Sequence, residues 1–461
     1  MAILLDIQTE SQPTSEHTIY VNSQIISQLN LPINRIIPII FGSKKINVYV
    51  SVSSSKGKLL ILPESIASQL LIPNGIQIHG KYDKEKGLIL GPTLGILLQN
   101  IYKNHTQEPF GEMTSFLKEI ALVSKSKGTL SYAFTLEDID LQNSSIKGWL
   151  LKGNRWEQNK LPIPDVIYNR ISSRKFEFKH QESIQQLKSK NYSHFFNDHF
   201  LNKWQVYDLL KNTSVQSILP NTKLYKNHTT IKEMLNKYPT SYLKPTNGSL
   251  GRGIIKVQKR GAEYFVRLSK INGPLSLNYN SFAQMVKQLT PRLKSEPYII
   301  QEGIDLITIK NRPVDFRILV QKNETGNWAI TSMVARVADE QQFVSNLARG
   351  GTQSKVMHAI HLSNLNNRQK VSPDYFTNYS LAIAKQIEAS SNGSFAELGI
   401  DLGLDVNGKL WLLEVNAKPS KNNDPGLTGA RPSVHRLIDY TRFLTGLFIT
   451  KKKKKMKKKP Q

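Results

Sequence analysis

Two short segments near the carboxyl end of the chain constrain the fold most, because both alternate apolar and polar residues with period two. They span residues 395–401 and 410–416, and Asn407-Gly408 lies between them. Asn-Gly flanked by alternating strands is the strongest short-range signal for a β-hairpin. If those two residues form the loop, Asp401 lies directly opposite Glu414.

The same register places Gly399 opposite Asn416 and gathers polar side chains on one face of the hairpin. Like charges directly opposite each other destabilise a strand pair, so Asp401 beside Glu414 favours a cation between them. Two carboxylates and an amide suit Mg²⁺ or Mn²⁺ bridging substrate phosphates. A hairpin whose polar face is simply hydrated is an equal alternative at this point. The opposite, apolar face is predicted to carry Leu398, Ile400, Leu402, Leu413 and Val415.

Composition limits the remaining possibilities. The 461 residues contain no cysteine, which excludes disulfides and thiolate metal sites. The amino-terminal sequence has no basic region before its first apolar residues, so no signal peptide is expected, and the apolar runs are too short to span a bilayer. We therefore expect a cytoplasmic protein without a transmembrane segment.

The formal net charge is +27, and the segment 451–459 is almost entirely lysine. So dense a run of like charge cannot fold on itself, and residues 450–461 are predicted to form a disordered tail. The tail is suited to contact with a polyanion, although a solvated tail without a dedicated partner is equally compatible with its composition.

Patterning predicts three folded regions. Residues 1–86 contain short β-branched runs broken by Gly, Pro, Asn and Ser, which indicates a small β-rich domain. Residues 87–200 alternate strands and helices as an α/β unit does, and residues 201–449 have an α+β pattern. No internal repeat is apparent.

A glycine-rich loop between two predicted strands is the second motif. It runs from Lys244 to Gly253 and contains three glycines, a hydroxyl and a flanking lysine. Backbone N–H groups in such a loop can surround phosphate oxygens while the lysine adds a positive charge. The loop is neither a Walker A nor a Rossmann motif, and Gly/Ser/Asn loops are often ordinary turns.

A cluster of arginines is the third motif. Arg317 and Arg336 lie on consecutive predicted strands, and Arg349 lies in the following Asn-x-x-Arg-Gly-Gly segment. Together with Lys244 they form a cationic set suited to phosphoryl transfer. An apolar strand ending at Gln301-Glu302 could offer its backbone to an adenine edge, although a core strand that simply meets a loop accounts for the same pattern.

The order of these motifs resembles the ATP-grasp superfamily over about residues 200–448. The segments 164–171 and 414–420 resemble more specifically the YheC/YheD family, which is described as endospore coat-associated. The resemblance implies an ATP-grasp fold of two α+β subdomains in 201–449, preceded by an α/β pre-ATP-grasp unit and the small β-rich domain.

The resemblance also implies roles at matching positions. The metal ligands would be Asp401, Glu414 and Asn416, in agreement with the hairpin register, while Glu397 matches no ligand position. Arg317, Arg336 and Arg349 would stabilise an acyl-phosphate and its transition state, with Asn346 and Gly350-Gly351 near the acceptor. The residues implied to contact ATP are Lys203, Lys244, Gly248, Ser249, Gly251, Gly253, Gln301, Glu302, Gly303 and Ile304.

The implied function is an ATP- and Mg²⁺-dependent ligase that joins an unidentified carboxylate to an amine or thiol through an acyl-phosphate. No protein nucleophile is required, because cations supply the charge stabilisation. The alternative is a nucleotide-binding, non-catalytic protein that helps to assemble a spore coat. A nucleic-acid-binding protein is a third class, and its support is the net charge alone.

Overall fold

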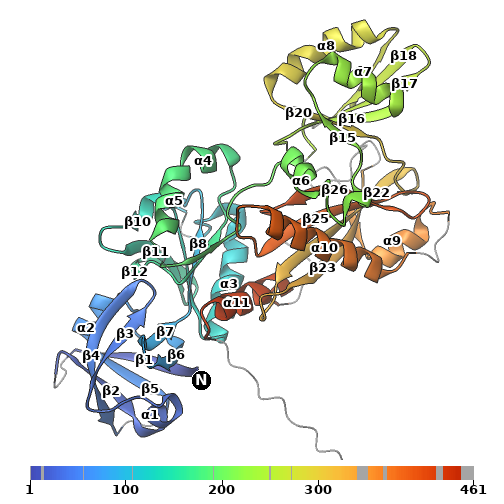
Figure 1. Cartoon of the computed structure of the whole chain (residues 1–461). Coiled ribbons are helices and arrows are strands. Elements are labelled where there is room, and N and C mark those ends of the chain that lie inside the picture. The colour runs from blue at the N-terminus through green and yellow to red at the C-terminus, as the bar shows by residue number, and fades with distance from the viewer. Residues whose placement is uncertain are drawn as a thin grey trace, which may run out of the picture. The chain divides into compact units, whose positions relative to one another are not determined.

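The computed structural model describes residues 2–11, 15–54, 57–105, 107–190, 192–248, 251–270, 273–339, 351–366, 371–421 and 429–447. The predicted site residues Ser249 and Arg349 lie outside the described residues, as do Asn346, Gly350 and the lysine tail. The chain forms two compact units, whose elements are labelled in Figure 1. The first unit comprises residues 1–198, 322–327 and 420–461; the second comprises 199–321 and 328–419.

The first unit begins with a closed barrel in the strand order β1-β5-β2-β4-β3-β7-β6. Its interior is filled by fully buried apolar side chains such as Ile19, Val50 and Leu60. Strand β7 follows the predicted boundary at residue 86, yet it pairs with β3 and β6 and completes the barrel. The elements are β1 (Ile3–Glu10), β2 (Thr18–Asn22), α1 (Ser23–Leu29), β3 (Ile36–Phe41), β4 (Lys44–Ser53), β5 (Leu59–Pro63), α2 (Glu64–Leu70), β6 (Gln77–Asp83) and β7 (Gly87–Gly91).

Two segments of the barrel, β2-α1 and β5-α2, form a structural repeat that the sequence pattern did not reveal. Both β2-α1 and β5-α2 include the sequence Ser-Gln-Leu, at residues 27–29 and 68–70. Both helices end in a left-handed residue, Asn30 with φ 54° and Leu71 with φ 57°. Strand β4 runs parallel to β2, and β1 takes the same place beside β5. The repeat is hard to recognise in the sequence because one of its equivalent strands comes from the amino terminus.

An α/β sheet completes the first unit, in the order β10-β11-β9-β8-β13-β14. Helix α11 packs on α3, where Lys127 Nζ lies 2.7 Å from Asp439 Oδ1 and Arg431 Nη2 lies 3.3 Å from Glu119 Oε1. The predicted segment 201–449 is therefore divided between the two units. The elements are β8 (Thr93–Leu97), α3 (Thr114–Ser126), β9 (Leu130–Phe134), β10 (Ile139–Asp140), β11 (Ser145–Lys152), β12 (Arg155–Pro162), β13 (Val166–Asn169), α4 (Arg174–Lys179), α5 (Gln181–Ser189), β14 (His194–Phe196) and α11 (Pro432–Leu444).

The second unit contains two sheets, and the first has the order β15-β20-β16-β17-β18-β19. Helices α7 and α8 cover one face, which contributes Leu243, Val257 and Ile300 to a buried core (Figure 1). The elements are α6 (Lys203–Leu210), β15 (Thr222–Leu224), α7 (His228–Lys237), β16 (Thr240–Pro245), β17 (Ile255–Arg260), β18 (Glu263–Leu268), β19 (Leu275–Tyr279), α8 (Phe282–Ser295) and β20 (Tyr298–Glu302).

The second sheet of this unit has the order β24-β23-β22-β25-β26, with β21 paired to β22. Helix α10 packs on β23 and β25, and apolar residues such as Phe316, Ile400 and Phe376 form the core between them. The elements are β21 (Thr308–Ile309), β22 (Arg312–Lys322), β23 (Trp328–Val337), β24 (Thr352–Ser354), α9 (Val356–Leu362), α10 (Pro373–Ser390), β25 (Glu397–Leu404) and β26 (Leu410–Asn416).

Short 3-10 helices also occur at Gly111–Met113, Leu136–Asp138 and Gln216–Ile218. Among the described residues, no helix is both long and apolar enough to cross a membrane. The predicted fold class is confirmed: α+β subdomains follow an α/β unit and a β-rich amino-terminal region.

Candidate nucleotide and metal site

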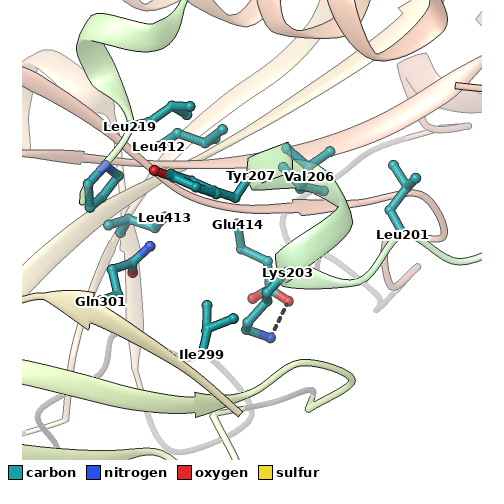
Figure 2. A pocket seen from close by; sticks show the side chains of 12 residues that line it. Leu201, Lys203, Val206, Tyr207, Leu219, Ile299, Gln301, Leu412, Leu413 and Glu414 are labelled. Carbon is teal, nitrogen blue, oxygen red and sulfur yellow. Dashed lines mark hydrogen bonds and ion pairs between the residues drawn. The ribbon is translucent and has the colours of Figure 1, made fainter. Parts of the chain in front are cut away.

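A pocket in the second unit brings together residues from α6, β20 and β26 (Figure 2). Helix α6 supplies Lys203, β20 supplies Gln301 and β26 supplies Glu414, so three predicted site residues face one space. Apolar side chains form the rest of the wall, which suits the flat face of a base. The lining residues are Leu201, Lys203, Val206, Tyr207, Leu219, Pro220, Ile299, Gln301, Leu412, Leu413, Glu414 and Val415.

Lys203 lies at the first position of α6 because Asn202 begins that helix. Asn202 accepts a hydrogen bond from the backbone N–H of Gln205, whose side chain accepts one from the N–H of Asn202. This capping box fixes where the helix starts. The Lys203 ammonium lies 3.1 Å from Glu414 Oε1 and donates to the carbonyl of Gly248 at 2.7 Å. A positive group therefore links the glycine-rich loop to the acidic hairpin.

Lys244 lies on β16 beside the pocket and donates a 2.6 Å hydrogen bond to Gln301 Oε1. Burial and, to a smaller extent, the neighbouring Lys203 lower the pKa of Lys244 to about 8, while Glu414 acts in the opposite direction. An anionic ligand would favour the charged form of this lysine. Lys203 and Lys244 thus form a pair of cations poised for anionic charge.

The glycine-rich loop needs its glycines at two of the predicted positions. Gly251 and Gly253 have φ of 67° and 72°, a region that L side chains rarely occupy. A Cβ added at Gly253 would also meet Pro245 Cγ at 2.8 Å. Gly248 donates to the carbonyl of Pro245 at 3.2 Å, which closes the turn. The loop is therefore a defined backbone structure at both described ends.

The side chains of the predicted adenine hinge, residues 301–304, do not all face the pocket. Gln301 lines the pocket, and its amide also donates to Thr222 Oγ1 at 3.1 Å. Glu302 alternates to the other face, where it accepts a 3.0 Å hydrogen bond from Asn221. The backbone N–H of Gly303 donates a 2.8 Å hydrogen bond to the carbonyl of Thr240. Ile304 lies beyond the end of β20.

The hairpin register predicted around the site is confirmed, but the predicted two-residue loop is wrong. Asp401 pairs with Glu414 and Gly399 with Asn416, whereas Leu402 pairs with Leu412 across a bulge. The bulge offsets a longer loop, in which Asp405 N donates to the carbonyl of Lys409 and Asp405 Oδ1 accepts from the N–H groups of residues 407 and 409.

The bulge also changes the direction of one side chain. Leu413 was predicted on the apolar face, yet Leu412 is the residue that joins the buried core. Leu413 lines the pocket instead. Its side chain lies next to Gly403, since a Cβ added to that glycine would be 3.3 Å from Leu413. The prediction failed there because a strict period of two does not continue through a bulge.

Asp401 is held by two arginines. Arg317 bonds both of its carboxylate oxygens, and Arg336 Nη2 lies 3.0 Å from Oδ2. Burial would raise the pKa of Asp401, but Arg317 and Arg336 outweigh it and hold this pKa below its usual value. The carboxylate therefore stays ionised although it is only 5% exposed.

Arg336 lies deeper than the sequence suggested. Its Nε and Nη2 bond Asp315 Oδ1 and Oδ2 at 2.6 and 2.7 Å, a bidentate pair, while a third contact reaches Asp401. Burial alone would lower the pKa of Arg336, yet the two aspartates raise it overall. The sequence analysis gave Asp315 no role, because strand spacing alone does not show which residue faces an arginine on another strand.

Glu397, whose role the sequence left open, is 2% exposed and accepts a 2.9 Å hydrogen bond from Gln321. Glu414 Oε2 and the Asn416 amide make no hydrogen bond or ion pair among the residues that the structure describes. Oxygen donors of this kind fit Mg²⁺ or Mn²⁺. Within the same residues, no group of three or more His, Asp or Glu side chains is arranged to hold a metal ion.

Two α+β lobes around a lysine-lined pocket and an acidic hairpin define the ATP-grasp class of protein. The model of the YheC/D-like ATP-grasp family matches residues 192–444, and the chain belongs to that family. It is 25% identical to the endospore coat-associated protein YheD of Bacillus subtilis (strain 168), over 93% of this chain and 92% of YheD. It is also 25% identical to the endospore coat-associated protein YheC of the same strain, over 66% of this chain and 85% of YheC. The solved structure of the ATP-grasp ligase PsnB complexed with minimal precursor has a TM-score of 0.45 and 13% identity, over 77% of this chain and 100% of PsnB.

Proposed function

We propose that this chain is an ATP- and Mg²⁺-dependent ligase that joins a carboxylate to an amine or thiol. The observation that supports it best is the convergence of Lys203, Lys244, Gln301 and Glu414 around one pocket. Each residue type matches a different part of Mg-ATP: two cations for phosphate, an amide for the base and a carboxylate for the metal.

In this proposal the substrate carboxylate attacks the γ-phosphorus of ATP, which gives an acyl-phosphate and ADP. The amine or thiol then displaces phosphate from the acyl carbon, and its proton is lost to solvent. Lys203 and Lys244 hold the phosphates, and the 247–253 loop would cover the γ-phosphate. Glu414 and Asn416 would hold Mg²⁺, which supplies charge neutralisation between phosphate oxygens.

The arginines take different roles. Arg317 has a side chain that is 24% exposed, so its outer face can meet an anionic substrate while Asp401 fixes its position. Arg336, at 8%, is a positioning residue, because Asp315 and Asp401 already occupy its guanidinium. Arg349 stays a proposed catalytic residue on the resemblance alone. Both carboxylate oxygens of Asp401 are bonded by arginines. We therefore propose Asp401 as a metal ligand only through oxygen lone pairs that these hydrogen bonds do not use.

The test is ADP release by the purified protein with Mg-ATP and panels of amino acids, peptides and polycarboxylates. Steady release that requires an added substrate supports the ligase, and Lys244→Ala should lower ATP affinity. Lys259→Ala is the matched control, because Lys259 lies on the neighbouring strand β17 and bonds Asn236 instead. Release that is absent with every panel would count against the proposal.

The second candidate is a nucleotide-binding, non-catalytic protein of the forming spore coat. It is favoured by the names of the two relatives, both called endospore coat-associated. A cytoplasmic protein of this kind could contact polyanions through its lysine tail. Saturable ATP binding without turnover supports it, and loss of polyanion binding on deleting residues 451–461, with ATP binding intact, would assign the tail.

A further inference from the structure

The pocket-facing side of the β15–β20 sheet carries a row of polar side chains that continues beyond the nucleotide pocket. Gln301 on β20 pairs with Tyr242 on β16, Tyr242 pairs with Lys256 on β17, and Lys256 pairs with Arg267 on β18. Directly paired residues point to the same face of a sheet. The row therefore starts at the pocket wall and crosses three further strands, which Figure 1 labels β16, β17 and β18.

The opposite face of the sheet forms the hydrophobic core of this subdomain, so the polar row is not part of a core. Ile255, Val257 and Val266 alternate with the row and are buried under α7 and α8. By contrast, Tyr242, Lys256 and Arg267 are all only partly buried. They are within reach of solvent and of a ligand.

The charges in the row are unfavourable as they stand. Lys256 lies directly opposite Arg267, and like charges in that arrangement destabilise a strand pair. The ammonium groups of Lys244 and Lys256 lie 5.6 and 5.8 Å from the centre of the Tyr242 ring. Asp305 acts electrostatically on both Lys256 and Tyr242, and it raises the pKa of each.

Lys256 is the clearest member of this group. Burial lowers its pKa and Arg267 lowers it further, while Asp305 raises it. Its ammonium makes no hydrogen bond or ion pair among the residues that the structure describes. A half-buried cation without a carboxylate partner, held opposite a second cation, would be stabilised by a bound anion.

We propose that Tyr242, Lys256 and Arg267 bind an acidic peptide segment of the substrate beside the nucleotide pocket. The assignment rests on the proposed ligase function and names its substrate class as a polycarboxylate. Backbone N–H groups in mid-sheet are used in the strand ladder, so the row offers side-chain donors only and lacks the backbone nest typical of phosphate sites.

The spacing of the row supports more than one carboxylate. Adjacent strands lie about 4.8 Å apart, so Tyr242 on β16 and Arg267 on β18 are separated by roughly 10 Å across the sheet. One carboxylate cannot bridge that distance. Alternate side chains of an extended peptide lie on one side about 7 Å apart, so two acidic residues of such a peptide can reach the two ends of the row, Tyr242 and Arg267, together.

The test uses the full chain, saturated with ADP and Mg²⁺, and a triglutamate peptide as the probe. Calorimetric titration should show binding to the wild type and about tenfold weaker binding to Lys256→Gln, with Lys256→Arg close to wild type. Lys259→Gln is the matched control on the opposite face of the same strand and should bind as the wild type does. ATP affinity is measured separately for each variant.

Three results would overturn the assignment. Equal losses in Lys256→Gln and Lys259→Gln would mean general charge attraction, to which the lysine tail contributes in every variant. Peptide binding to the nucleotide-free chain that is lost when ADP and Mg²⁺ are added, or a loss of ATP affinity in Lys256→Gln, would place this lysine in the nucleotide site. ADP release can be absent with every substrate panel while the peptide result holds, so failure of the ligase proposal is distinguishable from failure of this one.

Discussion

Two aspartates, one in each unit, show how differently the chain treats a carboxylate. Asp165 in the first unit accepts hydrogen bonds from the N–H and hydroxyl of Thr93 at 2.7 and 2.8 Å. Burial raises its pKa to about 6, although both hydrogen bonds act in the other direction. Asp401 in the second unit has arginine partners instead, and its pKa is lowered.

The difference teaches where charge is maintained in this molecule. Neutral donors anchor the segment around Asp165 but leave its charged form disfavoured. Guanidinium groups keep Asp401 ionised in a similarly shielded place, on strand β25 of the hairpin, directly opposite the pocket residue Glu414. The second arrangement suits a site that handles phosphate and metal charge, whereas the first suits a structural anchor.

The largest effect is expected from removing the centre of the Asp401 cluster. Arg336→Met should lower the free energy of unfolding by about 3–5 kcal/mol, because Asp315 and Asp401 would be left buried with a charge missing beside them. Urea unfolding without nucleotide measures it. Arg252→Ala, an exposed site in the same unit, should change stability by no more than about 0.5 kcal/mol. If the two substitutions changed the free energy of unfolding equally, the arginines would not be what stabilises the charged form of Asp401, and its contrast with Asp165 would be lost.

The second effect is a pH dependence located at Asp165. Its pKa rises from 3.8 in the unfolded chain to about 6 in the fold. The folded state then holds the proton more tightly, so this group favours folding at low pH, and that contribution is lost as pH rises from about 4 to 6. The loss is at most about 3 kcal/mol for a partly exposed side chain.

Asp165→Asn should remove that window while keeping an oxygen for Thr93. The measurement is the free energy of unfolding of wild type and variant at pH 4 and pH 7. Asp401 has the opposite sign, because a lowered pKa gives stability that is lost only as pH falls below the usual carboxyl range. A wild type and an Asp165→Asn variant with parallel pH profiles would contradict the assignment.

The third prediction concerns Glu414, whose second carboxylate oxygen is proposed for Mg²⁺. Glu414→Gln should abolish the stabilisation by Mg-ATP, which is about 2.7 kcal/mol at a ligand concentration of 100 Kd. The fold should persist, because the Lys203–Glu414 contact is partly exposed. Thermal unfolding with and without Mg-ATP provides the measurement, and Glu263→Gln at an exposed position is the control. A wild-type rise in melting temperature for Glu414→Gln would count against the metal proposal.

Much of this site was predictable because its signals are local. Alternating strands located the hairpin, and the pairs Asp401–Glu414 and Gly399–Asn416 were obtained correctly despite the wrong loop, since loop and bulge offset each other. The direction of Leu413 was not predictable, because the bulge interrupts the alternation.

Tertiary partners were beyond the sequence for a different reason. The bond from Arg336 to Asp315 joins two separate strands, and nothing in the spacing shows that the aspartate faces the arginine. The repeat in the barrel was equally hidden, because hydrophobic core positions and helix ends constrain only a few residues in each half.

The smallest effect is expected at Lys244, a shielded cation that has an amide as its hydrogen-bond partner where Arg336 has two carboxylates. Its pKa of about 8 means that the ammonium loses its proton as pH rises above 8. Because phosphate binding requires the charged form, ATP affinity should fall by up to about tenfold between pH 8 and 9, a change of about 1.4 kcal/mol.

Lys244→Arg should remove that decline, because a guanidinium stays charged throughout this range. Lys203→Arg is the matched control: Lys203 is paired with Glu414, so its replacement should leave the decline in place. Titration of ATP at pH 7, 8 and 9 measures all three proteins. If the ATP affinity of the wild type is constant across this range, Lys244 stays charged in the free protein. The contrast between a charge with ionic partners, as at Asp401, and a charge with a neutral partner would then not apply to Lys244.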